Sequence, residues 1–153
     1  MKINLPPIQQ EKTYTCLPAC LRIVLRYSGT SLTEEEIAQI CHTTQAGTTL
    51  ADAVHAVHSL SFKATRIQDA TLEDLMHSLS HNEPVIVLVG VEHLPYGDFG
   101  THAVTVCGFE GDEILYIDPA LGQEVRLDIV TFLNAWRSRG RRGLVVHSRS
   151  KAS

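Results

Sequence analysis

Hydrophobic residues recur at helical spacing through the first half of the chain. The run CLPACLRIVLRY carries its apolar side chains on one stripe and is followed by Gly29, which predicts a helix over Cys16–Tyr27. Pro18 stands in the first turn of that helix, where a missing N–H is harmless. Capping signatures and apolar spacing predict three further helices, over 34–41, 49–58 and 72–79.

The second half changes to short apolar runs that are typical of strands. Gly and Asp turns and one predicted helix over 128–136 separate five such runs: PVIVLVGV, HAVTVCGF, EILYIDP, QEVRL and GLVVHS. Helices first and strands afterwards indicate an α+β class, with N-terminal helices packed on a C-terminal antiparallel sheet. Because no repeat or low-complexity segment occurs, we expect one domain over 8–147 with flexible termini at 1–7 and 148–153.

Composition and charge limit the classes of function. The 153 residues are 44% hydrophobic and 20% charged, which is ordinary for a globular protein with a buried core. The formal net charge of -4 gives no positive field that would attract a nucleic acid. Neither the N-terminal segment nor the longest apolar run, Val85–Val91, has the length of a signal peptide core or a membrane span. We therefore expect a cytoplasmic protein that does not insert into a membrane.

One of the four cysteines is placed for chemistry. Cys16 begins a predicted helix, and a thiol there becomes a nucleophile if a base deprotonates it and donors stabilise the oxyanion that forms. His102 supplies a base, Asp118 a carboxylate to orient that base, and Gln10 an amide donor. We interpret the remaining cysteines as reduced, structural thiols; they are Cys20, Cys41 and Cys107.

The order of the strands predicts how the base and the carboxylate meet. His102 opens one predicted strand and Asp118 closes the next, with a turn expected at Gly111 and Asp112. The two arms of this antiparallel hairpin are nearly equal in length, so the two side chains should lie level with each other. A cleft is expected where the amino end of the first helix meets the strands, with Cys16 on one wall.

These features resemble the papain-like cysteine peptidases that cut leader peptides after a double glycine during bacteriocin export. The resemblance rests on Gln10 six positions before Cys16, on HAVTV at His102 and on DPALG at Asp118. It implies a papain-like fold in which Cys16 attacks the scissile carbonyl, His102 takes and returns the proton, and Asp118 orients His102. Gln10 and the backbone N–H of Cys16 would bind the oxyanion, and no cofactor is implied.

Two positions depart from the usual pattern of that family. Thr15 replaces an acidic residue before the nucleophile, and Leu17 replaces a glycine after it. Leu17 is expected to lie where the substrate backbone passes closest to the thiol, which implies either a cleft of different shape or loss of activity. The family domain commonly precedes membrane helices and an ATPase, but no phosphate-binding glycine loop occurs here. An export transporter would therefore be a separate partner chain.

Three functions stay open on these residues. The first is a cysteine endopeptidase for an extended peptide with small residues before the cut, with the segment Glu92–Gly100 as a mobile wall of the cleft. The second is an amidase or acyltransferase that passes an acyl group from Cys16 to an amine, which Leu17 favours. The third is a module that binds a leader peptide without cutting it. In each case the partner is a peptide or protein.

Two further clusters have less specific interpretations. The basic segment Arg137–Arg142 is expected to be a solvated loop, with a grip on an acidic part of the substrate as the alternative. Glu73, His77 and His81 stand one turn apart on a predicted helix, but on the face opposite its apolar stripe. Because that face should meet solvent, we expect no metal site there.

Overall fold

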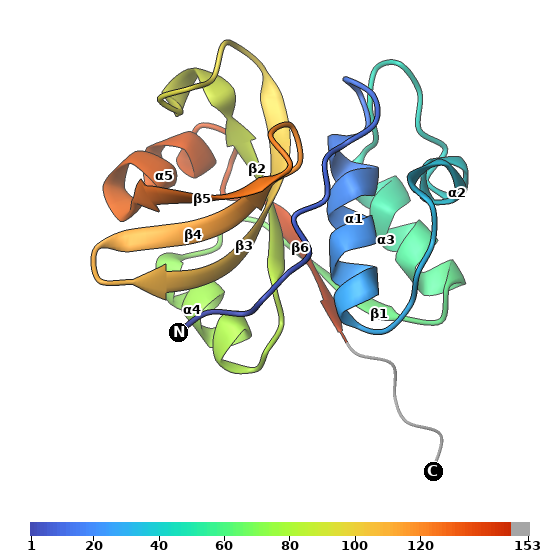
Figure 1. Ribbon diagram of the computed structural model, residues 1–153, viewed down its shortest axis with the longest axis horizontal. Coiled ribbons are helices and arrows are strands. Elements are labelled where there is room, and N and C mark those ends of the chain that lie inside the picture. The colour runs from blue at the N-terminus through green and yellow to red at the C-terminus, as the bar shows by residue number, and fades with distance from the viewer. Residues whose placement is uncertain (148–153) are drawn as a thin grey trace.

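Within residues 1–147, a six-stranded antiparallel sheet separates three helices on one side from two on the other (Figure 1). The computed structural model describes residues 1–147. The helices are α1 (Cys16–Tyr27), α2 (Glu34–Ile40), α3 (Leu50–Ser59), α4 (Leu72–Ser80) and α5 (Ile129–Arg137), with a short 3-10 turn η1 (Val91–His93). The strands are β1 (Lys63–Ile67), β2 (Val85–Gly90), β3 (Thr101–Glu110), β4 (Glu113–Asp118), β5 (Gln123–Asp128) and β6 (Gly143–His147). The predicted helices and strands are thus present, each within two residues of its expected ends.

Side-chain caps fix where four of the helices begin, namely α2, α3, α4 and α5. Thr33 accepts a hydrogen bond from the backbone of Glu36, whose side chain bonds back to the Thr33 N–H, and α2 starts between them. Thr71 and Asp74 make the same reciprocal pair at α4. Each pair satisfies two backbone N–H groups that would otherwise lack partners, so these local sequences favour the start of a helix at these positions.

The sheet contains one strand that the hydrophobic pattern does not predict. The strand order is β1-β6-β2-β3-β4-β5, and β1 pairs with β6 from Lys63↔His147 to Ile67↔Gly143. The β1 sequence KATRI has no apolar run, and none of its residues is fully buried. It is an edge strand, stabilised by backbone pairing with β6 more than by burial, so a search for hydrophobic strands misses it.

Alternate residues of the central strands enter two separate cores. On β2, Val85, Val87 and Val89 pack with α4 and α5, whereas Ile86 faces the helices α1 to α3. The period of two explains this division, since successive side chains of a strand point to opposite faces. Both faces of β2 are buried, which accounts for its continuously apolar sequence.

The predicted hairpin of β3 and β4 contains one irregularity. Its turn lies at Gly111 and Asp112 as expected, because Glu110 pairs with Glu113. The register then shifts between Val106 and Gly108, so that the ladder ends at Thr105↔Ile117. The extra residue is a β-bulge, and it moves the strand end that carries Asp118 by one position along β3.

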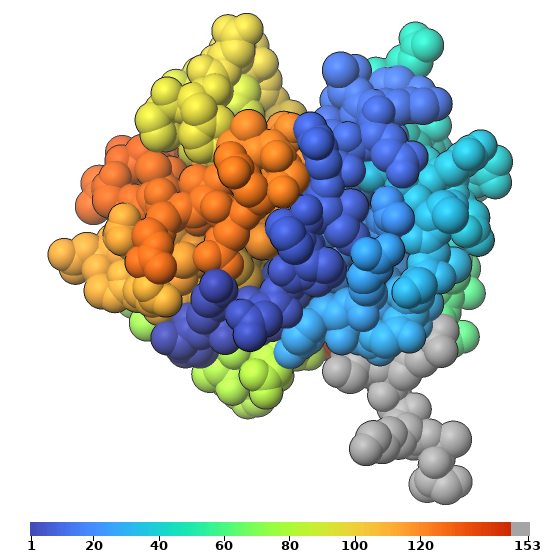
Figure 2. Space-filling view, viewed as in Figure 1, coloured from blue at the N-terminus to red at the C-terminus, as the bar shows by residue number. Residues whose placement is uncertain are grey.

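The expectation that residues 1–7 are a flexible terminus is corrected by the structure. Ile3 and Leu5 are 5% and 9% exposed and belong to the core beneath β3 and β4. Lys2 forms a bridge with Gly108, and the Ile3 N–H donates to the carbonyl of Cys107 at 2.8 Å. In Figure 2 this dark-blue segment lies at the molecular surface, next to the yellow and orange residues of the sheet strands.

The reason for this error is that the segment is short and contains two prolines, a composition typical of linkers. The side chains of Ile3 and Leu5 nevertheless pack into the core next to the bulge. The other predicted terminus, 148–153, lies outside the described residues. No helix within residues 1–147 has the length and apolar character that crossing a membrane requires.

Candidate active site

The half-buried thiol of Cys16 is the first side chain of α1. No acidic residue occupies the first turn, and Thr15 makes no side-chain cap, so the N–H groups of the helix end remain directed at the thiol region. Burial raises the pKa of Cys16, but hydrogen bonding and charge from His102, with the backbone N–H groups of Ala103 and Leu17, outweigh it. The net result is a lowered pKa, which favours the thiolate.

His102 and Asp118 meet across the sheet. His102 Nε2 and Asp118 Oδ1 are 2.7 Å apart, with side-chain exposures of 12% and 1%. Burial lowers the pKa of His102, but the hydrogen bonds and charges of Asp118 and Cys16 raise it to about 9. Burial likewise raises the pKa of Asp118, yet His102, Tyr96 and the N–H of Ala120 hold it below its usual value. The pair therefore exists as an imidazolium beside a carboxylate.

The bulge in β3 is what allows this contact. With Thr105 opposite Ile117, Asp118 lies beside Val104, and His102 is two residues farther along the same face. Without the extra residue Asp118 would lie beside Thr105, and His102 would point to the opposite face. The two residues are therefore diagonal neighbours rather than level as expected.

Tyr96 is a site residue that the sequence did not reveal. Its hydroxyl donates to Asp118 Oδ2 at 2.8 Å and also shares a hydrogen bond with the Tyr116 hydroxyl at 2.7 Å. Asp118 thus holds His102 through one carboxylate oxygen and Tyr96 through the other. Tyr96 lies in a loop rich in Gly and Pro, and no local spacing links it to Asp118, so only the fold identifies it.

Gln10 lies beside the turn that follows Asp118. Its backbone N–H donates to the carbonyl of Pro119 at 2.7 Å, and its side-chain Nε2 donates to the carbonyl of Lys12 at 2.8 Å. Its Oε1 is buried without a hydrogen-bond partner. No hydrogen bond joins Gln10 to Cys16 in this part of the structure. The amide is fixed near the cleft, and its second N–H is not used by Lys12.

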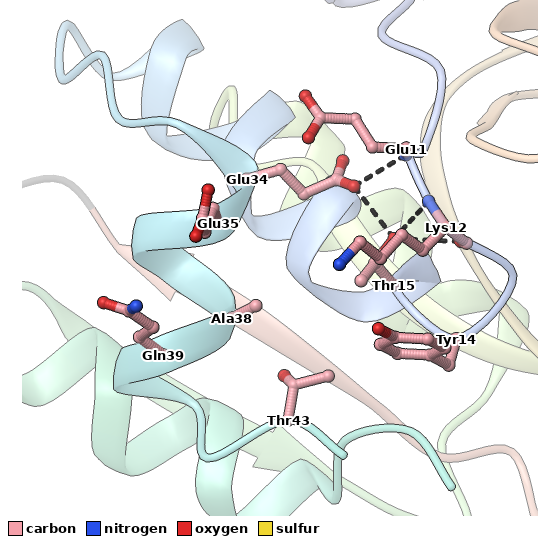
Figure 3. A pocket seen from close by; sticks show the side chains of 9 residues that line it. All are labelled: Glu11, Lys12, Tyr14, Thr15, Glu34, Glu35, Ala38, Gln39 and Thr43. Atoms are coloured by element: carbon pink, nitrogen blue, oxygen red, sulfur yellow. Dashed lines mark hydrogen bonds between the residues drawn. The ribbon is translucent and has the colours of Figure 1, made fainter. Parts of the chain in front are cut away.

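The segment before the nucleophile is held by a buried carboxylate from α2 (Figure 3). Glu34 is 1% exposed, and its Oε2 accepts from the Glu11 N–H at 2.7 Å and from the Thr15 hydroxyl at 2.8 Å. The Thr15 hydroxyl also accepts from the N–H of Lys12. An acidic group thus reaches the position before Cys16 from another helix, although residue 15 itself is a threonine.

The expectation that Leu17 obstructs the nucleophile is wrong. Its side chain is 3% exposed and packs in the core formed by α1, α2 and α3. The residue after Cys16 is already in the helix, and that position turns its side chain away from the cleft. The sequence position next to the thiol did not reveal this direction, because it depends on how α1 is rotated against its neighbours.

A cavity of about 280 Å³ opens beside His102 and Asp118. Of the segment Glu92–Gly100, which is expected to form a wall of the cleft, residues 96–100 line this cavity. Arg139 fastens one end of that segment, since its guanidinium pairs with Glu92 at 2.9 Å and donates to the Thr101 hydroxyl at 2.7 Å. Within the predicted basic loop, Arg139 is therefore engaged by the protein itself and is not a solvated side chain.

The other cysteines differ from Cys16 in exposure and in pKa. All three are fully buried, and burial raises the pKa of Cys41 and of Cys107 to about 12 and that of Cys20 well above its usual value. The rings of His77 and His81, at the carboxyl end of α4, are tilted against each other with centroids 4.5 Å apart. Among residues 1–147, no three His, Cys, Asp or Glu side chains are grouped as metal ligands would be.

Comparison with known proteins places the chain among relatives. Residues 2–144 match the Peptidase_C39 like family. An uncharacterized protein of Methanothermobacter thermautotrophicus is 31% identical over 116 residues, covering 76% of this chain and 72% of that protein. An uncharacterized protein of Methanothermobacter marburgensis is 28% identical over 123 residues, covering 80% of this chain and 78% of that protein.

Solved structures share the fold. A protein of Bacillus anthracis described as a C39-like peptidase has a TM-score of 0.78 at 20% identity, covering 97% of this chain and 96% of that chain. The peptidase domain of Streptococcus ComA, a bi-functional ABC transporter of a quorum-sensing pathway, gives 0.71 at 24% identity, with 94% and 95% covered. A double glycine motif protease from an AMS/PCAT transporter, solved with the leader peptide, gives 0.70 at 19% identity, with 95% and 91% covered.

At sequence identities this low, the structural similarity shows a shared fold and nothing more. It confirms the predicted α+β class and the papain-like peptidase fold, with helices packed on an antiparallel sheet. The family match extends over nearly the whole described chain. The chain therefore belongs to the Peptidase_C39 like family.

Proposed function

We propose that this chain is a cysteine endopeptidase that cuts a leader peptide after small residues such as Gly-Gly. One observation carries the proposal: a thiol with a lowered pKa interacts with an imidazole that is fixed at 2.7 Å from a buried carboxylate. Membership of a peptidase family and the likeness to a protease solved with a leader peptide support the same substrate class.

The chemistry begins from a thiolate and an imidazolium. The Cys16 sulfur attacks the scissile carbonyl carbon, and the carbonyl oxygen becomes an oxyanion. His102 then gives its proton to the leaving nitrogen, the C–N bond breaks, and the acyl group stays on sulfur as a thioester. Water, deprotonated by His102, releases the acyl group and restores the thiolate. Asp118 keeps the ring oriented and stabilises its positive charge throughout.

Two donors would bind the oxyanion. The backbone N–H of Cys16 lies at the amino end of α1, where the helix dipole favours negative charge. The side chain of Gln10 supplies the second donor through the Nε2 hydrogen that Lys12 does not use. Removal of one such donor typically lowers kcat by about a hundredfold or more, so Gln10→Ala should show a loss of that order.

The structure changes the weight of the alternatives. An acyltransferase was favoured by a bulky Leu17 beside the nucleophile, but the burial of Leu17 removes that reason. A module that only binds its peptide does not require a lowered pKa at Cys16 or a raised pKa at His102. If the substrate is an exported peptide, an export transporter is the expected partner.

A single assay distinguishes the three functions. The chain is incubated with peptides that contain Gly-Gly ahead of a varied segment, and products are identified by mass spectrometry. A peptidase yields a new C-terminal glycine, an acyltransferase yields an amide when an amine is added, and a binding module leaves the peptide intact. Cys16→Ala should abolish cleavage, whereas Cys41→Ala, a matched change at a buried thiol, should retain it. Cleavage that survives Cys16→Ala would overturn the proposal.

A further inference from the structure

We propose that the cavity beside His102 is the subsite for the residue that follows the scissile bond, and that it takes a large apolar side chain. This inference rests on the proposed peptidase function and names a further feature of its substrate. The cavity lies between the segment Val91–Thr101 and the turn that joins β4 to β5, and its volume is about 280 Å³. That is enough space for one leucine or phenylalanine side chain.

The position of the cavity assigns it to the leaving side of the substrate. His102 lines the cavity, and His102 is the group that must protonate the leaving nitrogen in an acyl transfer. The nitrogen therefore lies within hydrogen-bonding reach of the ring. The side chain of the same residue is only two bonds from that nitrogen, so it falls into the space next to His102.

The lining of the cavity indicates what kind of side chain fits. Seven large hydrophobic residues are exposed among residues 1–147, and Tyr96, Phe99 and Leu121 are three of them, with exposures of 42%, 80% and 39%. All three line this one cavity, together with Val91 and Ala120. Exposed apolar side chains that converge on a hollow mark a binding surface, because a ligand removes them from water.

The wall of the cavity is held in place before any ligand binds. The hydroxyl of Tyr96, which belongs to the wall, donates to Asp118. The guanidinium of Arg139 pairs with Glu92 at the beginning of the wall segment. Gly97 packs so closely that a Cβ there would overlap the carbonyl oxygen of Val91. A pre-formed apolar hollow spends less free energy on ordering itself, which favours selection of a matching side chain.

A carboxylate outside the proposed catalytic group also lines the cavity. Asp98 is exposed and would attract a basic residue. Asp118 lines it as well, but its carboxylate is occupied by His102 and Tyr96. Three exposed apolar side chains against one solvated carboxylate favour an apolar occupant, and a basic one is the competing outcome of the test.

The test compares peptides that differ only in the residue after Gly-Gly. We expect kcat/KM to be about tenfold higher for Phe or Leu than for Gly or Asp, as for partial burial of one apolar side chain. Phe99→Ser and Leu121→Ser should each reduce that preference about threefold or more. Val130→Ser, which alters another exposed apolar residue, on α5, should leave both the preference and the rate for the Gly peptide unchanged.

A second measurement probes the same subsite without a long peptide. A glycyl-glycine ester acylates Cys16: the C–S bond forms, the ester C–O bond breaks, and the alcohol leaves with the proton of His102. The amides of Phe, Leu, Lys and Gly are then offered as acceptors. The acceptor nitrogen attacks the thioester carbon, a C–N bond forms, the C–S bond breaks, and the ammonium proton passes to His102 or water. Phenylalaninamide and leucinamide should intercept the thioester more efficiently than glycinamide, and Phe99→Ser should reduce that advantage.

The outcomes separate this inference from the proposed function. If the chain cuts peptides but shows no preference after the bond, or prefers Lys, the apolar subsite is overturned and the peptidase stands. If neither peptides nor the ester react at Cys16, the proposed function fails and the subsite fails with it. A preference that Phe99→Ser and Leu121→Ser leave intact would place the subsite elsewhere.

Discussion

At the scale of single residues, Cys16 and His102 shift each other in opposite directions. The imidazolium lowers the pKa of the thiol, and the thiolate helps to raise the pKa of the imidazole to about 9. Both groups are therefore charged over a range of pH in which an isolated cysteine would be a neutral thiol and an isolated histidine a neutral ring. A nucleophile and an acid stand ready together, as acyl transfer requires.

This pairing predicts the pH dependence of alkylation. Because the pKa of Cys16 is lowered, its thiolate should persist to lower pH than that of an ordinary cysteine, so Cys16 should react with iodoacetamide faster than the buried thiols at pH 6. In His102→Gln the burial effect dominates, and the labelling curve should move to higher pH. Mass spectrometry of labelled peptides measures this, with the buried Cys41 as internal reference. Equal, slow labelling of both thiols at pH 6 would contradict the assignment.

Tyr96 is expected to act on the proposed reaction through Asp118. Its hydroxyl helps to keep the carboxylate ionised and fixed, so Tyr96→Phe should lower kcat about tenfold with little change in KM. The acidic limb of the pH–rate profile should also move toward higher pH, because Asp118 loses a stabilising donor. Tyr27→Phe, at an exposed tyrosine of α1, is the matched control. A change in KM alone would show that Tyr96 only contacts substrate.

At the scale of elements, the site depends on how helix ends and strand ends are fastened. The amino end of α1 points its N–H groups at the nucleophile because Thr15 bonds to Glu34 and Lys12 instead of capping the helix. The bulge in β3 turns His102 and Asp118 to the same face. The Thr15 hydrogen bonds and the β3 bulge thus position the groups of the proposed site, although neither feature supplies a reacting group itself.

Glu34 is expected to act as a positioning residue for the nucleophile segment. Glu34→Ala removes the acceptor of Glu11 and Thr15, and it should lower kcat/KM tenfold or more and destabilise the fold by about 1–3 kcal/mol. Glu34→Gln keeps an acceptor oxygen and should recover much of both losses. Glu35→Ala, at the exposed neighbour, should have little effect on either quantity. Activity measured alongside chemical denaturation separates positioning from simple instability, which would lower activity only as the folded fraction falls.

In the whole molecule, one sheet separates two hydrophobic cores, and the N-terminal segment packs along this sheet. The helices α1 to α3 bring Cys16 to one face, and β3 and β4 bring His102 and Asp118 to the adjoining strand ends. Residues 1–7 then run along the sheet lobe and place Gln10 against the turn after Asp118. Cys16, His102 and Asp118 come from distant parts of the chain and meet only in the complete fold.

The packing of the N-terminal segment makes a prediction for stability. Ile3→Ala should destabilise the protein by about 2–4 kcal/mol, because a core side chain is truncated. Val130→Ala, on a side chain that is 69% exposed, should change the free energy of unfolding by less than about 0.5 kcal/mol. Denaturant titration measures both changes. Cys107, whose carbonyl accepts from Ile3, should also become alkylated faster in Ile3→Ala. A negligible change would mean that residues 1–7 detach in solution.

Much of the fold followed from local patterns, and the exceptions have physical causes. The helices and most strands are predicted because their apolar spacing or caps act over a few residues. The edge strand β1 and the packed segment 1–7 are missed because their stability comes from partners distant in the sequence. Leu17 is misjudged because a helix rotation, set by packing, decides where its side chain points.

Residue types and their intervals along the chain were enough to predict the α+β class, the family resemblance and the candidates Cys16, His102, Asp118 and Gln10. The folded structure was needed to find that one extra residue in β3 aligns His102 with Asp118, that Tyr96 and Glu34 contact the residues of the site, and that an apolar hollow lies beside it. The reason is that direction and proximity across a fold arise from register, twist and packing, which no short stretch of sequence encodes.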